Sequence, residues 1–550
     1  MSLYNYRRRK TSETKVGKIG IGGENPIRVQ SMTNHSTMDT EACIRQALEI
    51  SGAGGELVRL TTQGVREAEN MSKIRAGLLN EGCDVPLVAD VHFNPAAAFK
   101  AAETCQKVRI NPGNFVDAAR TFKKLHYTDE EYAAEILKIR DKLLPFLEIC
   151  KKNSTAVRLG VNHGSLSDRI MSRYGDTPRG MVESVMEYLR IACEVDFKDI
   201  VISIKASNVV VMVETVRLLV KEMDEEGMSF PIHLGVTEAG DGEDGRIKSA
   251  VGIGSLLAEG IGDTIRVSLT ENPVNEIPVA RKLLDHITSR KDHTPIEEPQ
   301  NISADSKRGR PEQDYLKETD SILFYYRDKG QFPVVVGYDL MLDPEEVHYN
   351  KASENPPVYN DNKPVVVESF HVNGPGEMAA WIDRFAEKNQ NPVILKFHYD
   401  VTDPEDLQIK ASADLGSLLL KGYGAGILIE APAINQDTIN SIALGILQAT
   451  RLRISHTEYI ACPGCGRTLF DLQKTLAKVK SATSHLTGLK IGVMGCIVNG
   501  PGEMADADYG YVGAGSGKVS LYKGKELMKK NIPEEDAIPL LLELIESGHP

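Results

Sequence analysis

Short apolar runs recur along the first half of the chain, separated by longer segments in which apolar residues have helical spacing. Eight of these runs fall at residues 27–32, 56–60, 86–92, 105–111, 155–162, 199–205, 231–238 and 263–268. Strands that alternate with helices pair in parallel, and eight such units in roughly 270 residues fit a closed barrel. The pattern predicts an N-terminal (β/α)8 TIM barrel, residues 1–288, that binds the substrate.

Polar side chains gather at the carboxyl ends of these runs, the end of such a barrel that carries the active site. Five of them are cationic: Arg59, Arg109, Arg158, Lys205 and Arg266. Others are Asp90, His92, Asn111, Asn162 and Ser268. Five cations at one mouth repel one another, and guanidinium groups match phosphate oxygens, so we expect a phosphorylated substrate rather than an internal lattice of salt bridges. Glu238 adds a carboxylate, either as a proton donor or as a counter-charge to the arginines.

The composition changes after residue 288. Residues 289–315 are polar, charged and punctuated by proline, as a linker is. Strand-like runs then return at 334–338, 365–368, 393–397 and 426–430, with helical patterns at 378–388 and 407–421. They predict an α/β insert domain, residues 289–437, which could form a partial barrel.

An eight-residue sequence occurs twice, at 372–379 and at 498–505. Its Gly-Pro-Gly-Glu core is typical of a strand-to-helix turn, with proline at the first helical position and an acid in the first turn. Cys496 stands two residues before the second copy, whereas Phe370 takes that place before the first. We interpret the first copy as structural.

Three of the eight cysteines cluster in the C-terminal α/β domain, predicted over residues 438–550. Cys462 and Cys465 flank a Pro-Gly turn that lets both sulfurs face one metal, and Cys496 ends a strand-like run at 491–496. Glu503 adds one carboxylate. Three soft ligands and one hard ligand favour an iron–sulfur cluster with an unusual corner. The alternative is structural zinc, for which His456 and His485 are further donors.

Composition narrows the classes of function. A chain of 550 residues with 41% hydrophobic and 26% charged residues is typical of a globular protein of two or three domains. Its net charge of −13 argues against nucleic acid as the main partner. The basic residues 7–10 precede no apolar stretch of a signal peptide, and no apolar run is long enough to span a membrane. The single cysteines of the first half fit a reducing cytoplasm, so we expect a cytoplasmic protein.

Eight motifs point to one family. They read VQSMT at 29–33, PLVADVHF at 86–93, RINPGN at 109–114, IKAS at 204–207, LGVTEAG at 234–240, EGIGDTIRVS at 259–268, IACPGC at 460–465 and GCIVNGPGE at 495–503. In these segments the chain resembles the hydroxymethylbutenyl diphosphate synthases, iron–sulfur enzymes of isoprenoid and terpenoid biosynthesis by the non-mevalonate pathway. The resemblance covers residues of about 1–285 and 440–515.

The resemblance implies an oxidoreductase that reduces 2-C-methyl-D-erythritol 2,4-cyclodiphosphate by two electrons to 4-hydroxy-3-methylbut-2-enyl diphosphate, with ring opening and loss of water. It implies ferredoxin or flavodoxin as electron donor, and a [4Fe-4S] cluster with one carboxylate among its ligands, which are Cys462, Cys465, Cys496 and Glu503. Substrate binding would fall on Arg59, His92, Arg109, Arg158, Asn162, Lys205, Arg266 and Ser268. Glu238 and Glu503 would take part in catalysis.

The insert of about 150 residues resembles that of the family's long form. In short forms the cluster comes from the partner subunit, so a homodimer is one expectation. The other is that the insert acts as a spacer and lets one chain close on itself. Two competing hypotheses remain. One is a zinc-stabilised barrel enzyme that acts on phosphate esters, and the other is a non-enzymatic scaffold.

Overall fold

The computed structural model describes residues 2–117, 126–299, 333–339, 341–496, 500–504 and 506–548. It contains two compact units. The barrel unit holds Lys10–Gly245, Gly262–Arg281 and His456–Pro550, and the insert unit holds Met1–Arg9, Arg246–Ile261 and Lys282–Ser455. The expected barrel and cluster domains thus share one unit, and the expected limits at 288 and 437 stay a prediction. Residues 300–315 of the predicted linker lie outside the described residues.

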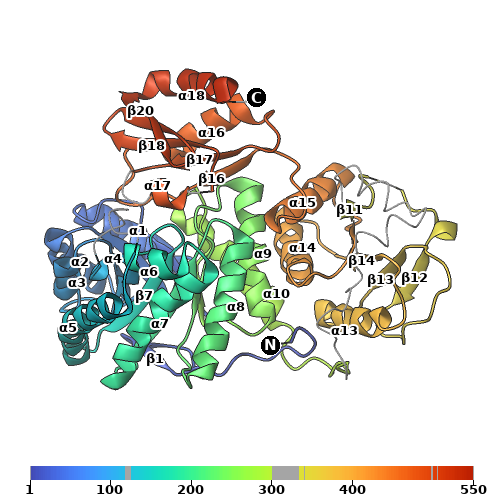
Figure 1. The fold of residues 1–550 in the computed structure, drawn as a ribbon, viewed down its shortest axis with the longest axis horizontal. Helices are drawn as coiled ribbons and strands as arrows, with labels where there is room; N and C mark the ends of the chain where they lie inside the picture. The colour runs from blue at the N-terminus through green and yellow to red at the C-terminus, as the bar shows by residue number, and fades with distance from the viewer. Residues whose placement is uncertain are drawn as a thin grey trace. The chain divides into compact units, whose positions relative to one another are not determined.

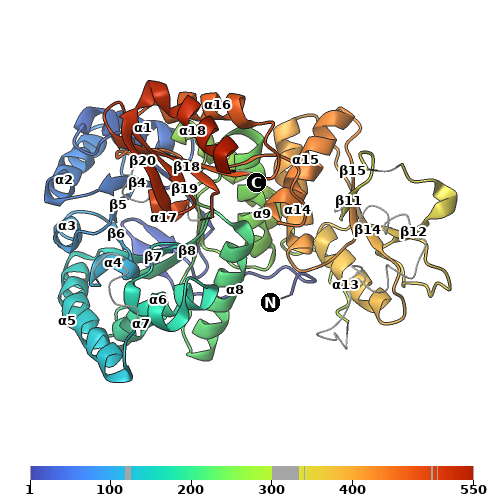
Figure 2. The ribbon, with the colours of Figure 1, turned by 45° about the horizontal axis from the view of Figure 1, so that its top comes forward.

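Each of the eight predicted runs overlaps a strand of one parallel sheet. The strands are β3 (Arg28–Met32), β4 (Leu57–Thr62), β5 (Leu87–Val91), β6 (Lys107–Ile110), β7 (Ala156–Asn162), β8 (Ile200–Lys205), β9 (His233–Leu234) and β10 (Thr264–Ile265). Their order is β8-β7-β6-β5-β4-β3-β10-β9, and a parallel bridge between Ile202 and Ile232 joins the two ends. The ring of strands is seen obliquely in Figure 2. The predicted TIM barrel is confirmed.

Helices follow the strands and cover the outside of the ring. They are α1 (Thr40–Gly52), α2 (Val65–Asn80), α3 (Pro95–Ala101), α4 (Pro112–Phe115), α5 (Asp129–Asn153), α6 (Asp168–Tyr174), α7 (Pro178–Glu194), α8 (Val209–Glu225), α9 (Gly242–Ala258), η1 (Pro273–Asn275) and α10 (Glu276–Thr288). Side chains at their first turns fix where several begin. The Asn111 carboxamide oxygen, for example, accepts the Gly113 N–H at 3.0 Å at the start of α4. No described helix combines the length and apolarity needed to cross a membrane.

The barrel interior changes from apolar to polar along the strands. At one end the hairpin of β1 (Thr14–Val16) and β2 (Ile19–Ile21) packs on an apolar cluster that includes Leu57 and Val88. Side chains alternate across a strand, so residues two positions further on point to the same side. Those residues are Arg59 and Asp90. The carboxyl end of the barrel is therefore lined by charge.

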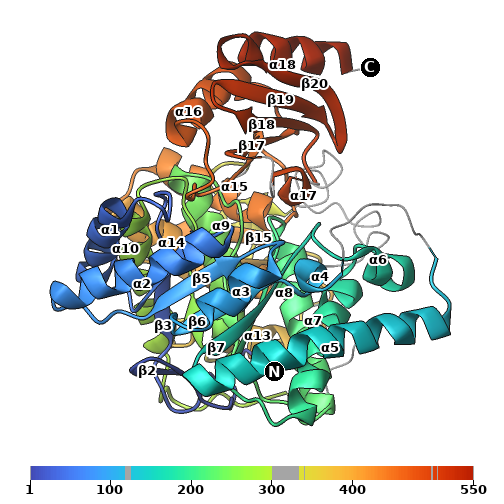
Figure 3. The ribbon, with the colours of Figure 1, turned by 90° about the vertical axis from the view of Figure 1, so that its left-hand side faces the viewer.

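The C-terminal part of the barrel unit is a five-stranded sheet with α16 and α18 on one face (Figure 3). Its elements are β16 (Glu458–Ala461), α16 (Leu472–Thr483), β17 (Lys490–Met494), α17 (Gly500–Glu503), β18 (Tyr509–Gly515), β19 (Lys518–Lys523), β20 (Glu526–Pro533) and α18 (Glu534–Gly548). β16, β17 and β18 are parallel neighbours, so Cys462 and Cys496, which follow β16 and β17, lie at the same edge.

That edge lies over the mouth of the barrel (Figure 1). A parallel bridge joins Ala239, in the loop after β9, to Ala461 at the end of β16. The Thr270 hydroxyl donates to the carbonyl oxygen of Cys462 at 2.9 Å. These contacts position the cysteine turn over the carboxyl ends of the barrel strands.

The insert unit contains a second parallel sheet, with strand order β11-β15-β14-β13-β12. Its elements are β11 (Val334–Val335), η2 (Pro344–Glu346), β12 (His348–Lys351), β13 (Val365–Glu368), α13 (Gly374–Ala386), β14 (Val393–His398), α14 (Pro404–Leu419), β15 (Gly426–Glu430) and α15 (Gln436–Ala449). β11 pairs with β15, as the first and last strands of a barrel do, in keeping with the partial barrel expected. The sequence did not predict β12, a strand in which half-buried and exposed side chains alternate and none is fully buried.

The first copy of the repeated sequence lies in this unit and begins α13. The Asn373 side-chain amide donates to the carbonyl oxygens of Leu3 and Tyr4, both at 2.9 Å. A Cβ at Gly376 would lie 2.4 Å from the Leu3 carbonyl oxygen, so only glycine lets the two segments approach so closely. The first copy thus holds the start of the chain, which is a structural role.

Candidate functional site

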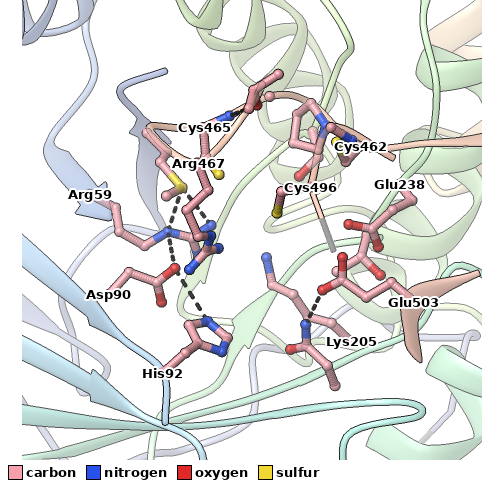
Figure 4. Close-up of a pocket in the computed structure, with 18 of the residues that line it drawn as sticks. Arg59, Asp90, His92, Lys205, Glu238, Cys462, Cys465, Arg467, Cys496 and Glu503 are labelled. Carbon is pink, nitrogen blue, oxygen red and sulfur yellow. Dashed lines mark hydrogen bonds and ion pairs between the residues drawn. The ribbon is translucent and has the colours of Figure 1, made fainter. Parts of the chain in front are cut away.

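One pocket of the barrel unit is lined by every substrate-binding, catalytic and cluster residue that the family resemblance implies (Figure 4). Asn111, another polar residue at a strand end, caps α4 instead. The barrel contributes Arg59, His92, Arg109, Arg158, Asn162, Lys205, Glu238, Arg266 and Ser268. The C-terminal sheet contributes Cys462, Cys465, Cys496 and Glu503. Both walls come from the same chain. The geometry brings these residues together, and their roles are argued below.

The barrel side of the pocket carries Arg59, Arg109, Arg158 and Lys205 and is called the cationic wall below. Asp90 lies at its centre. Its carboxylate oxygens lie 3.8 Å from Arg59 Nε, 3.4 Å from Arg109 Nη1 and 3.6 Å from Arg158 Nη2. Burial raises the pKa of Asp90, but the charges of Arg59 and Arg109 outweigh burial and hold the pKa well below its usual value. One carboxylate shared by three guanidinium groups leaves the wall with surplus positive charge.

Burial and mutual repulsion lower the pKa values of the crowded cations. Burial lowers the pKa of Arg59 to about 10, with further lowering from Arg266 and Arg109 that Asp90 only partly offsets. Burial and the charges of Arg59, Arg158 and Arg266 hold the pKa of Lys205 well below its usual value. A bound polyanion would relieve this repulsion, because it favours the charged form of each group.

Arg266 differs from the other pocket arginines because it has a carboxylate partner of its own. Its Nε and Nη2 donate to the two oxygens of Glu276 at 3.0 and 2.9 Å, and both residues are buried. The Ser31 hydroxyl holds the same carboxylate at 2.7 Å. Such a bidentate pair fixes the guanidinium plane. The Glu276 carboxylate therefore balances the charge of Arg266. The guanidinium group still lines the pocket in a fixed orientation, but it adds little surplus positive charge.

His92 and Arg109 form a hydrogen-bonded pair that needs a neutral imidazole. Burial and then the charge of Arg109 lower the pKa of His92 to about 3. Arg109 bonds to the ring, and its Nη2 donates to the carbonyl oxygen of Gly160 at 2.8 Å. A Cβ at Gly160 would lie 2.6 Å from Arg109 Nε, so glycine makes room for this side chain.

Glu238 and Glu503 lie beside each other at one side of the pocket (Figure 4). Glu238 is buried and has φ of 52°, a strained value for a residue with a side chain. Burial and the neighbouring Glu503 carboxylate hold the pKa of Glu238 well above its usual value. The Asn162 amide donates to Glu503 Oε1 at 2.8 Å. The Asn162 amide thus ties Glu503 to the barrel, and the neighbouring Glu503 carboxylate favours the protonated form of Glu238.

The cysteine turn is suited to hold thiolates against the pocket. Gly464 has φ of 78°, and the Cys465 N–H donates to the Thr468 hydroxyl at 3.0 Å. The Gly495 N–H donates to Cys462 Sγ at 3.4 Å, a contact that stabilises a sulfur ligand. Among the described residues no three His, Cys, Asp or Glu side chains converge on one metal ion. A multi-iron cluster needs no such convergence, because each ligand binds a different iron. The donor set therefore fits a cluster.

Several pocket residues were missed or undervalued from the sequence. Arg467, two residues after Cys465, points into the pocket, and the charges of Cys465 and Asp90 raise its pKa although burial lowers it. Asp90 was visible only as one of several polar strand ends. Neither histidine proposed as a zinc ligand lines the pocket: His485 is absent from its walls, and His456 Nε2 bonds to Asp244 at 3.2 Å.

Comparison with known proteins assigns the chain to a family. The model of the GcpE TIM-barrel domain matches residues 11–281, and that of the GcpE protein C-terminal domain matches residues 458–547. The 4-hydroxy-3-methylbut-2-en-1-yl diphosphate synthase (flavodoxin) of Bacteroides fragilis is 56% identical, with 100% of this chain and 97% of the relative covered. Relatives of the same name from Porphyromonas gingivalis and Leptospira interrogans are 49% and 40% identical, covering 100% and 99% of this chain and 99% and 97% of their own. The chain belongs to the GcpE family.

Proposed function

We propose that the chain catalyses the reductive ring opening and dehydration of 2-C-methyl-D-erythritol 2,4-cyclodiphosphate to 4-hydroxy-3-methylbut-2-enyl diphosphate. It is an oxidoreductase that takes its electrons from flavodoxin, as the names of its relatives say of them. The observation that carries the proposal is one pocket with a cationic wall opposite three cysteines and a carboxylate.

The barrel wall binds the cyclic diphosphate. Arg59, Arg109, Arg158 and Lys205 neutralise its oxygens, and Asn162, Ser268 and neutral His92 add hydrogen bonds. Asp90 and Glu276 hold the guanidinium groups in place, so little reorganisation is needed when the diphosphate becomes a leaving group. Arg467 adds a cation from the opposite wall.

Cys462, Cys465, Cys496 and Glu503 are the residues that would hold a [4Fe-4S] cluster. When bound, it supplies electrons one at a time and has one iron whose hard oxygen ligand is exchangeable. The Asn162 amide orients the Glu503 carboxylate from the barrel side. The buried walls of the pocket exclude bulk water from the reacting carbons.

The reaction needs a proton donor, and we assign this role to Glu238. As two electrons enter, the bond between the tertiary ring carbon and its phosphate oxygen breaks, and the neighbouring hydroxyl leaves as water after gaining a proton. Glu238 is buried in the pocket wall beside Glu503, where it is placed to supply that proton. Since both walls come from one chain, a monomer holds a complete site, in keeping with a spacer role for the insert.

The test is turnover by anaerobically purified protein with dithionite and methyl viologen, followed by phosphorus NMR of the product. We expect ring-opened diphosphate and about four iron and four sulfide per chain. Arg109→Ala and Arg158→Ala should raise KM for the cyclic diphosphate. A colourless zinc protein with no product would refute the proposal.

A further inference from the structure

A second cavity lies on the outer side of the cysteine turn. This outer groove is lined by residues 34–35, 270–272 and 470–473, together with Gln46, Pro463, Gly464 and Thr468. Pro463, Gly464 and Thr468 also line the substrate pocket. The turn therefore borders both the substrate pocket and the groove.

Hydrogen bonds connect this groove to the cysteines. The Gln473 side-chain amide donates to the Thr270 carbonyl oxygen at 3.1 Å, and the Thr270 hydroxyl donates to the Cys462 carbonyl oxygen at 2.9 Å. The Thr468 hydroxyl accepts the Cys465 N–H. A group bound in the groove is thus joined to two of the three cysteines through short hydrogen-bonded paths.

The rim of the groove has the mixed character of a transient protein interface. Two exposed apolar residues neighbour the lining in the sequence: Met38, three residues after His35, is 50% exposed, and Leu469, between Thr468 and Phe470, is 42% exposed. The floor and walls are mostly polar, with Glu271 and Asp471 among them. A Cβ at Gly464 would meet nothing closer than Thr468 Oγ1 at 3.8 Å, so the backbone is open to a partner. Apolar anchors within a polar surround are typical of interfaces that form and dissociate.

We propose that the outer groove is the docking site of the electron donor, a flavodoxin-type protein that places the exposed edge of its flavin against the Cys462–Cys465 turn. The inference rests on the proposed function. The donor cannot enter from the pocket side, because the substrate occupies that side during turnover. Each docking event oxidises the flavin by one electron and reduces the cluster by one, so two events serve each substrate.

The test compares a protein donor with a small-molecule donor on the holoenzyme. Leu469→Glu and Met38→Glu place an unpaired carboxylate within the contact, where its desolvation opposes docking. With enzymatically reduced flavodoxin we expect KM for flavodoxin to rise about tenfold or more. With dithionite and methyl viologen, kcat and KM for the cyclic diphosphate should stay at wild-type values. Leu137→Glu, on exposed α5, is the matched control and should change neither assay.

Hydrogen–deuterium exchange gives an independent readout. Flavodoxin should slow exchange in residues 34–38 and 463–473 and leave α5 unchanged. Unchanged KM for flavodoxin in both rim variants, or protection confined to other segments, would overturn the proposal. Equal loss with both donors would also overturn it, because the rim would then serve the pocket and not the partner. A wild-type enzyme inactive even with dithionite would instead refute the proposed function.

Discussion

Replacing Asp90 by asparagine separates charge balance from substrate contact in the pocket. Asp90 is 3% exposed, and its oxygens lie 3.4 to 3.8 Å from nitrogens of Arg59, Arg109 and Arg158. Asparagine keeps the shape of the side chain but removes the charge that these three groups share. Breaking a buried ion pair from one side costs about 3–5 kcal/mol. We expect the ligand-free D90N chain to lose about 3 kcal/mol of unfolding free energy.

The same substitution should strengthen anion binding. A phosphate held by these guanidinium groups about 5 Å from Asp90 is repelled by roughly 2 kcal/mol at an effective dielectric of about 30. Without that repulsion, pyrophosphate should bind about thirtyfold more tightly, since 1.4 kcal/mol is about a factor of ten. The two effects have opposite signs: the ligand-free chain becomes less stable, and its affinity for pyrophosphate becomes higher. A general loss of structure would weaken both.

Urea denaturation and pyrophosphate calorimetry measure the two quantities. Asp414→Asn is the matched control, because Asp414 is a buried carboxylate paired with Arg290 and His286 in the insert unit. D414N should destabilise the insert unit and leave pyrophosphate affinity unchanged. Weaker pyrophosphate binding in D90N would mean that Asp90 acts mainly by holding the guanidinium groups in place for the anion, and would refute the charge-balance argument.

Three further changes test other parts of the site. Glu503→Ala should keep iron and sulfide content but lower kcat about a hundredfold, and unchanged turnover would refute the exchangeable corner. Gly160→Ala places a Cβ 2.6 Å from Arg109 Nε and should weaken pyrophosphate binding about tenfold by calorimetry; equal affinity would remove Arg109 from the ligands. His92 has a pKa of about 3 when folded and about 6.5 unfolded, so the native state binds fewer protons in between. Its share of stability, complete above pH of about 6.5, should fall by about 1.4 kcal/mol at pH of about 5.5. His92→Gln should lack this part of the fall in urea denaturation.

Periodicity and strand-end chemistry were enough to predict the barrel and which of its residues line one pocket. Parallel strands alternate with helices at a spacing that the sequence displays, and barrel geometry sends every carboxyl end to one mouth. The sequence alone could therefore place four cations in one pocket: Arg59, Arg109, Arg158 and Lys205. The cysteine turn was visible because its ligands are close in sequence.

Pairings between distant segments could not be predicted in this way. The partner of Arg266 is Glu276, which reads in the sequence as an ordinary helix acid but is almost completely buried. Arg467 enters the pocket only because the C-terminal sheet lies over the barrel mouth. Strand β12 has no buried face in its own sequence pattern, so periodicity alone could not reveal it.

The repeated sequence shows where local information ends. Both copies begin a helix, α13 at Gly374 and α17 at Gly500. In each, the second glycine approaches another backbone: Gly376 meets Leu3, and a Cβ at Gly164 would lie 2.3 Å from the Gly502 carbonyl oxygen.

The two copies differ in what surrounds the shared acid. Glu377 accepts a hydrogen bond from Ser369 at 2.6 Å, within its own loop, whereas Glu503 accepts one from Asn162 of the barrel and faces Glu238. The same Gly-Pro-Gly-Glu residues thus begin a helix in both places, and the distant side chains decide that only the second copy meets a substrate pocket. The one local difference that marks the second copy is the cysteine two residues before it, Cys496, because a ligand carboxylate is of use only where thiolates stand beside it.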